Sequence, residues 1–319
     1  SFRPVARKRR AAFRFRRRAM SATVARPATA AGNARGVLFI IAAMAVFATQ
    51  DALSKHLAER YSVIFITMLR YWFFALFVVA LASRREGGLR AAAATSLPWL
   101  QAFRGVLLAV EICVMVTAFA LLGLVESHAI FASYSLIVAA LSGPVLGERV
   151  GWRRWLAIAV GFVGVVVILR PGTQVFDPSA ILAVIAALMF ALYGLLTRYV
   201  GRVDSAGTSF FYTGVFGAAA MTLVGPFFWT PMAGWDWALM AALCVTGASG
   251  HFLLIKALEQ AEASAVQPFT YLQLVFASAI GVGMFGEAVE APLVVGAALV
   301  VGAGLFTIWR ERAARARAA

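Results

Sequence analysis

Apolar residues dominate the chain in long runs, which are separated by short segments containing charges, proline or glycine. The runs lack the apolar–polar alternation of a β-barrel strand and the helical period of an amphipathic surface helix. At a rise of about 1.5 Å per residue, each run can cross roughly 30 Å of hydrocarbon as a helix. The pattern predicts an all-α membrane protein whose ten transmembrane helices lie at residues 36–56, 62–82, 98–122, 125–146, 152–169, 179–199, 207–228, 237–257, 263–285 and 290–309.

Short motifs recur in the same order in the two halves of the chain. FATQDALSKHL, residues 47–57, is echoed by FALYGLLTRYV, residues 190–200, at an offset of 143. Tyr134 and Tyr271 correspond at a similar offset of 137. The nearly constant offset indicates two homologous halves of five helices each. Because an odd number of crossings turns the second half over, we predict an inverted repeat, with a substrate site near the midplane between the halves.

Basic residues are concentrated at one end of the chain. Residues 1–35 contain 11 Lys and Arg and no acidic residue, which leaves 18 basic and 14 acidic residues in the remainder. We expect this segment to be a disordered cytoplasmic tail near anionic lipid headgroups, with a nucleic-acid-binding arm as the alternative. The predicted inner loops and C-terminal tail then contain 13 Lys and Arg, whereas the outer loops contain 3. This asymmetry predicts that both termini are cytoplasmic.

Several classes of function lack their sequence signatures. The chain contains no phosphate-binding loop, HExxH pair or GxSxG elbow, so neither an ATP-driven pump nor a hydrolase of these types is predicted. Its 3 histidines and 2 cysteines, Cys113 and Cys244, have no metal-ligand or redox spacing. We therefore expect no enzyme activity, no metal, no cofactor and no nucleic-acid partner. An intramembrane enzyme using Glu111 or His251, a channel and a lipid flippase are the alternatives to a carrier.

Two long segments resemble the halves of EamA-type members of the drug/metabolite transporter superfamily. ALLGLVESHAIFASYSLIVAALSGPVLGERVGWRRWLAIAVGFVGVVVILRPG, residues 120–172, is similar to the first half. ALEQAEASAVQPFTYLQLVFASAIGVGMFGEAVEAPLVVGAALVVGAGLF, residues 257–306, is similar to the second half. The resemblance extends over residues 36–312. It implies a ten-helix fold, a location in the bacterial inner membrane and carriage of small metabolites.

The same resemblance divides the chain into domains. The first five-helix repeat is expected at residues 36–172 and the second at 173–312, followed by a cytoplasmic tail at 313–319. Many relatives have a proline in the middle of the fourth helix, where this chain has Leu136–Ile137–Val138. We therefore expect Pro268, in the ninth helix, to contribute more to gating.

Charged side chains occur inside the predicted helices. A charge at the bilayer centre costs at least about 2.5 kcal/mol, so each one needs a partner or a hydrated cavity. Arg70 is predicted to bind a carboxylate or phosphate of the substrate, or to pair with a buried acid such as Glu111. Glu111 and, with less support, Asp51 are candidates for proton coupling, although Asp51 lies four residues before Lys55 and is expected to pair with it. His251 is either a structural histidine or a proton relay.

Uncharged polar residues supply the other candidates for substrate binding. Gln50 has no obvious partner on its own helix and is predicted to face the cavity. On the ninth helix, Gln267, Tyr271 and Gln273 belong to a polar face that is expected to line a hydrated cavity, with helix–helix hydrogen bonding as the alternative. Tyr134 is the repeat partner of Tyr271. The two tyrosines are predicted to lie on facing helices at the central site.

The sequence therefore predicts a secondary transporter that works by alternating access in a lipid bilayer, as a monomer or a dimer. Its partner is a small-molecule substrate. Export of an amino acid or an amino-acid derivative is the leading hypothesis. Uptake of riboflavin, S-adenosylmethionine or a nucleoside-like compound is the alternative.

Overall fold

The computed structural model describes residues 30–146, 151–170, 177–261 and 267–318. These residues form a bundle of helices without strands, and ten helical segments are long and apolar enough to cross a membrane. The prediction of ten spans is confirmed. The five segments of the first half are α2 (Ala30–Ala58), α3 (Val63–Ser83), α5 (Pro98–Leu122), α6 (Leu124–Phe131) with α7 (Tyr134–Leu146), and α8 (Trp152–Leu169). The five of the second half are α9 (Ala180–Val200), α10 (Ala206–Val224) with η1 (Gly225–Phe228), α11 (Gly234–Gln260), η2 (Gln267–Tyr271) with α13 (Leu272–Phe285), and α14 (Ala291–Ala318).

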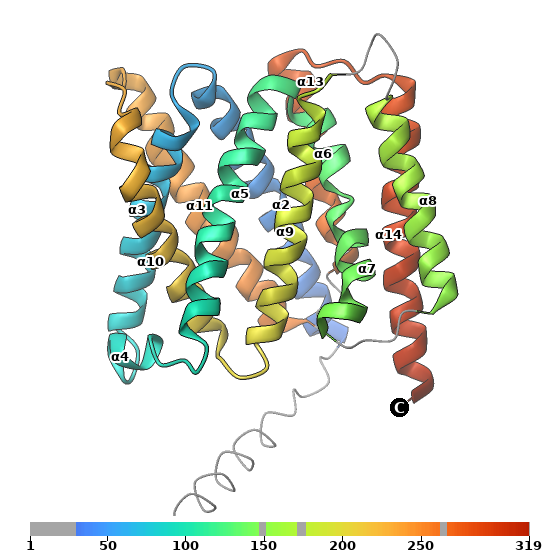
Figure 1. Cartoon of the computed structure of the whole chain (residues 1–319), viewed down its shortest axis with the longest axis horizontal. Helices are drawn as coiled ribbons and strands as arrows, with labels where there is room; N and C mark the ends of the chain where they lie inside the picture. The colour runs from blue at the N-terminus through green and yellow to red at the C-terminus, as the bar shows by residue number, and fades with distance from the viewer. Residues whose placement is uncertain (1–29, 147–150, 171–176, 262–266, 319) are drawn as a thin grey trace, which may run out of the picture.

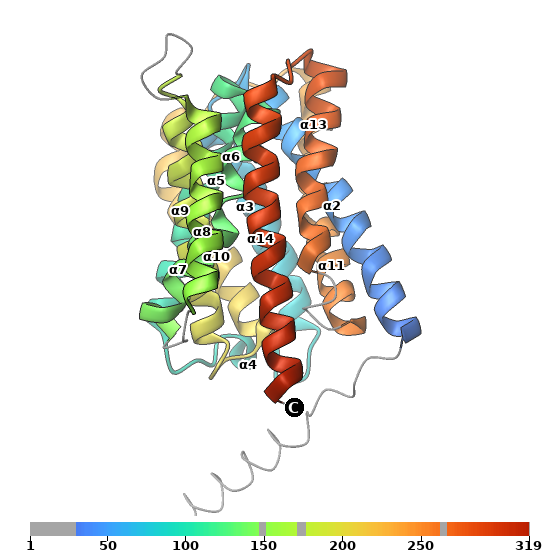
Figure 2. The same ribbon diagram turned by 90° about the vertical axis from the view of Figure 1, so that its right-hand side faces the viewer.

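The most extensive contacts between helices join one half of the chain to the other, and they follow the symmetry of the two repeats. The first helix of each half packs on the third helix of the other, α2 on α11 and α9 on α5. The two second helices, α3 and α10, pack on each other, as do the two last helices, α8 and α14. Figures 1 and 2 show α8 beside α14 along the bundle, and α2 begins at the end of the bundle where α14 finishes. A short helix, α4 (Gly88–Ala92), lies in the loop at that same end. This symmetric packing of corresponding helices is the arrangement expected of two inverted five-helix repeats.

Glycine permits the close approach of α8 and α14. A Cβ atom on Gly164 would lie 2.6 Å from the carbonyl oxygen of Gly296. Only a residue without a side chain allows the two backbones to come this near. The contact fixes the two last helices of the halves against each other.

The fourth membrane span breaks without a proline. α6 ends at Phe131 and α7 begins at Tyr134, so the helix is interrupted at Ala132–Ser133. The hydroxyl of Ser135 donates to the carbonyl of Ala132 at 3.1 Å, which satisfies an acceptor that the interruption leaves open. Pro268, in contrast, lies in the 3-10 helix η2 that precedes α13. The break in the fourth span thus arises without a proline, and a larger contribution of Pro268 to gating stays a prediction.

A carboxylate from the second half caps α6. Gly123, with φ of +94°, is the single residue between α5 and α6. The two carboxylate oxygens of Glu287 accept hydrogen bonds from the backbone N–H groups of Leu124 and Val125, each at 2.8 Å. A Cβ on Gly123 would lie 2.8 Å from the Glu287 carboxyl carbon, so glycine is required both by the backbone and by the cap. Glu148, the repeat partner of Glu287, lies outside the described residues.

Candidate functional site

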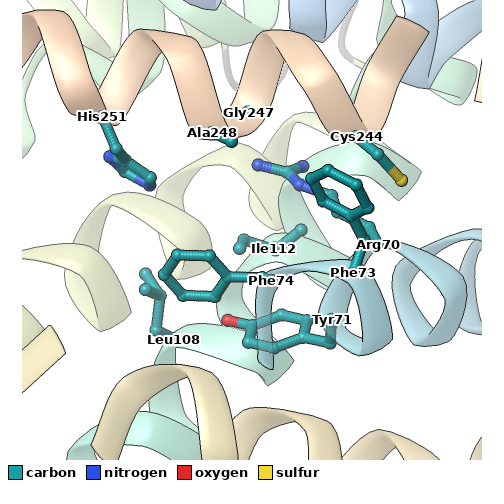
Figure 3. A pocket seen from close by; sticks show the side chains of 10 residues that line it. All are labelled: Arg70, Tyr71, Phe73, Phe74, Leu108, Ile112, Cys244, Gly247, Ala248 and His251. Carbon is teal, nitrogen blue, oxygen red and sulfur yellow. The ribbon is translucent and has the colours of Figure 1, made fainter. Parts of the chain in front are cut away.

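A cavity lies between α3 and α5 of the first half and α11 of the second half (Figure 3). It encloses about 410 Å³ of space between atoms, counted together with its open mouth. In Figure 3, the Arg70 guanidinium and the His251 imidazole both lie along the face of α11 that borders the cavity, with aromatic rings on the opposite side. The lining residues are Arg70, Tyr71, Phe73, Phe74, Leu108, Ile112, Cys244, Gly247, Ala248 and His251.

Gly247 brings two of the predicted substrate-binding residues together. A Cβ atom at this position would lie 3.0 Å from Gln50 Oε1 and 3.8 Å from Arg70 Nε. The side chains of Gln50 on α2 and Arg70 on α3 therefore approach the same turn of α11, where Gly247 has no side chain. Arg70 and Gly247 line the cavity, and the buried Oε1 of Gln50 lies directly behind Gly247.

Two buried polar groups near Arg70, Gln50 Oε1 and the hydroxyl of Tyr71, lack hydrogen-bond partners in the described part of the chain. Glu111, which is only 3% exposed, lies close to the same arginine. Arg70 and Glu111 are close enough for their charges to interact, yet no carboxylate among the described residues lies within ion-pair distance of the guanidinium. An unsatisfied buried polar group costs about 1–3 kcal/mol, so a cluster of them marks a place where water or a ligand completes the structure.

His251 sits among aromatic rings. Its ring centroid lies 5.2 Å from that of Phe47 and 5.9 Å from those of Phe74 and Phe210. No carboxylate of the described segments forms an ion pair with it. This environment suits a stacking or edge contact to a planar group better than the proton relay considered from the sequence.

The expected ion pair between Asp51 and Lys55 is wrong. Asp51 Oδ2 instead accepts a hydrogen bond from Gln273 Nε2 at 2.9 Å and lies 3.2 Å from Nε2 of His128. Lys55 lies 3.2 Å from Glu59 and 3.8 Å from Glu287. Although Asp51 and Lys55 share a helix, carboxylates from the next turn and from the second half are better placed for the lysine.

The predicted tyrosine pair forms a separate cluster beside η2. The hydroxyl of Tyr271 lies 2.6 Å from that of Ser135, and Tyr134 packs edge-on against Phe190 with centroids 5.0 Å apart. Neither tyrosine lines the cavity that contains Arg70. Gln267 begins η2, and its side chain lies outside the described residues.

Arg104 is a buried arginine with neutral partners. It donates to Gln101 Oε1 at 3.0 and 3.2 Å, to Thr197 Oγ1 at 3.1 Å and to the carbonyl of Ser209. Its guanidinium also lies over the ring of Tyr193, 5.1 Å from the centroid. These contacts satisfy the guanidinium within the scaffold, whereas Arg70 has donors left for a ligand.

Comparison with known proteins agrees with this architecture. The model of the EamA-like transporter family matches residues 34–170 and again residues 177–309. The chain belongs to the EamA-like transporter family. A solved crystal structure shares the fold with a TM-score of 0.60 at 19% sequence identity, covering 87% of this chain and 98% of that one. The family and the ten helices long and apolar enough to cross a membrane together make the chain a multi-pass membrane transporter.

Two groups of similar proteins have named cargoes. The S-adenosylmethionine uptake transporter of Rickettsia felis is 26% identical over 88% of this chain and 95% of its own length. The riboflavin transporter of Rhizobium johnstonii is 28% identical over 86% of this chain and 91% of its own length. The riboflavin transporter of Vibrio cholerae is 31% identical over 54% of this chain and 59% of its own length.

Sequence reasoning missed one member of the polar network of this EamA-like transporter. His128 is 4% exposed and touches Asp51, but its position near the end of a span gave it little weight beside His251. Asp51, His128 and Gln273 lie on three different helices, and no spacing along the chain links them. Only the packing of α2 against α6 and α13 brings them together.

Proposed function

We propose that this transporter carries a metabolite that joins an amino-acid zwitterion to an aromatic base, with S-adenosylmethionine as the leading cargo. The observation that carries the proposal is the cluster of unpaired polar groups around Arg70 and Glu111, at a cavity between the two halves. A guanidinium and a carboxylate that do not pair with each other complement a ligand that bears both charges.

Each part of such a cargo has a chemical counterpart in the cavity. The guanidinium of Arg70 binds the α-carboxylate, because arginine presents a planar fork of donors to carboxylates. The carboxylate of Glu111 and Oε1 of Gln50 accept hydrogen bonds from the α-ammonium. The rings of Phe74 and His251 provide faces and edges for the adenine, and the aromatic wall also attracts the sulfonium charge.

The earlier hypothesis of amino-acid export is revised in two respects. The zwitterion-binding chemistry is retained, but the aromatic side chains beside Arg70 and His251 suit a cargo that also carries a planar ring. The S-adenosylmethionine transporters among the relatives of similar length are named as uptake transporters, which supports uptake as the direction. Within this proposal the protein works by alternating access in the bacterial inner membrane, with both termini in the cytoplasm.

Riboflavin is the second candidate cargo. The aromatic lining and the riboflavin transporters among the similar proteins favour it. A flavin, however, has no zwitterion to engage Arg70 and Glu111 together. Transport of S-adenosylmethionine should therefore require Arg70 and Glu111, whereas transport of riboflavin should not.

Counterflow in proteoliposomes tests the proposal. Vesicles containing the purified protein are preloaded with unlabelled S-adenosylmethionine, and entry of the labelled compound is followed. We expect entry that is inhibited by S-adenosylhomocysteine, more weakly inhibited by adenosine or methionine alone, and not inhibited by riboflavin. Counterflow with riboflavin but not with S-adenosylmethionine would overturn the assignment.

A further inference from the structure

A second buried polar cluster lies apart from the cavity, where α2, α6 and α13 meet. Asp51 is 9% exposed and His128 is 4% exposed, and the carboxylate oxygen that faces His128 Nε2 at 3.2 Å also accepts the hydrogen bond from Gln273. His128 Nε2 makes no hydrogen bond to the described residues, so the Asp51 carboxylate is the charged group that it faces. The imidazole is held in place by stacking on Phe119, with ring centroids 5.0 Å apart.

The other charged side chains that the structure describes around Asp51 and His128 do not provide a cation that would neutralise the Asp51 carboxylate. From α5, the carboxyl group of Glu111 lies near enough to Asp51 to interact with it electrostatically, and it supplies no cation. On α2, Lys55 is engaged by Glu59 and Glu287. α13 contributes only the neutral amide of Gln273. Glu126, on α6 itself, interacts with Arg170, Asp177 and Glu290 instead.

Among the described residues, Asp51 has no cationic side chain other than His128 within ion-pair distance. Burial of an isolated charge is costly unless the charge is paired. Histidine is the side chain whose charge changes most readily near neutral pH. When His128 carries a proton, the pair is an ion pair across α2 and α6, and when it does not, the Asp51 carboxylate keeps only the amide of Gln273.

The helix that carries His128 is short and is separated from its neighbours at both ends. α6 contains 8 residues and lies between the single-residue turn at Gly123 and the interruption at Ala132–Ser133. Its first turn is held by Glu287 of the second half. A change of charge at the Asp51–His128 contact therefore acts on an element with a hinge at each end.

We infer that Asp51 and His128 form a proton-binding site that couples a pH gradient to cargo movement by fixing α6 on α2 or releasing it. The inference rests on the proposed carrier function and adds the driving ion. Arg70, Glu111 and Gln50 bind the cargo, whereas Asp51 and His128 bind the proton. Loss of the second pair should therefore uncouple transport without abolishing exchange.

Proteoliposomes under an imposed pH gradient separate coupling from carriage. The membrane potential is clamped to zero with valinomycin and equal potassium concentrations, because the cargo is charged. We expect the wild-type protein to concentrate S-adenosylmethionine by up to about tenfold per pH unit for each coupled proton. Asp51→Asn and His128→Gln should let the cargo equilibrate to a ratio of about 1 while retaining counterflow.

His56→Gln is the matched control, because His56 lies at the end of α2 and outside both clusters. It should accumulate cargo as the wild-type protein does. Accumulation by Asp51→Asn or His128→Gln at the wild-type level would overturn the inference. Absence of counterflow in the wild-type protein would instead refute the proposed cargo, and a measurement independent of cargo then decides on the proton site.

Nuclear magnetic resonance of ¹⁵N-histidine-labelled protein in detergent provides that measurement, because the chain contains only 3 histidines. We expect the His128 signals to change as the pH is lowered through the range in which histidines bind protons. Asp51→Asn should alter this response and leave that of His56 unchanged. His128 signals that ignore pH, or that respond identically in Asp51→Asn, would contradict a proton site.

Discussion

The hydroxyl groups of Tyr271 and Ser135 lie 2.6 Å apart and join η2 of the second half to α7 of the first half. The hydrogen bond therefore connects the fourth and the ninth membrane spans, which belong to different repeats. It sits outside the cavity that contains Arg70. Its position suggests a role in holding the halves together during the transport cycle, not in contacting the cargo.

Tyr271→Phe should alter transport rate more than cargo affinity. The substitution removes one hydrogen bond, worth about 1 kcal/mol, and leaves the ring in place. We expect counterflow to change by a few-fold at saturating cargo, while the cargo concentration that gives half-maximal thermal stabilisation of the purified protein stays the same. A large loss of affinity in Tyr271→Phe would return this tyrosine to the substrate site, as its place in the repeat first predicted.

Glu287 should contribute measurably to stability through the cap on α6. Glu287→Ala removes the acceptor for the N–H groups of Leu124 and Val125 and leaves them without a partner, at a cost of about 1–2 kcal/mol. The expected result is a lower unfolding temperature in detergent, read from tryptophan fluorescence.

Glu290→Ala is the control for this substitution. Glu290 pairs with Arg170 at 2.6 Å, but its side chain is 56% exposed. Exposed ion pairs contribute little to stability, so this variant should unfold close to the wild-type temperature. Equal unfolding temperatures for Glu287→Ala and Glu290→Ala would show that the cap is not needed.

Gly247→Ala should weaken cargo binding. The new methyl group would sit 3.0 Å from Gln50 Oε1 and 3.8 Å from Arg70 Nε, which narrows the cavity where the two groups converge. We expect a loss of about tenfold in affinity, or about 1.4 kcal/mol, measured by thermal stabilisation against cargo concentration. Gly283→Ala provides the control, since a Cβ there would meet nothing within 4 Å. Equal affinities for both variants would place the cargo elsewhere.

The number of spans and the inverted repeat were predictable from the sequence because both depend on local features. A run of apolar residues sets the length of a helix, and a constant offset between motifs reveals duplication. The interruption at Ala132–Ser133 was not predictable in this way, because it contains neither proline nor glycine. It depends on the serine hydroxyl that compensates an open carbonyl.

The candidate site was predictable only in part. Arg70, Gln50 and Glu111 stood out because polar groups are costly in a membrane helix; the structure places Gln50 and Glu111 near Arg70, which lines the cavity, and their binding of cargo stays a prediction. The partner of Asp51 was not predictable, because spacing on α2 pointed to Lys55 whereas packing between helices chose His128 and Gln273. Spacing along one helix shows which side chains could meet, but the partner that is found also depends on the rotation and depth of the neighbouring helices.

The pairing of Arg70 with the carboxylate of the cargo is the central claim, and a comparison of two ligands tests it most directly. Affinities for S-adenosylmethionine and for its decarboxylated analogue, which lacks only the α-carboxylate, are measured by thermal stabilisation of the wild-type protein and of Arg70→Gln. We predict that the wild-type protein prefers the complete cargo by at least about tenfold, as expected for a charge-assisted hydrogen bond, and that Arg70→Gln loses this preference. The same preference in both proteins would contradict the account.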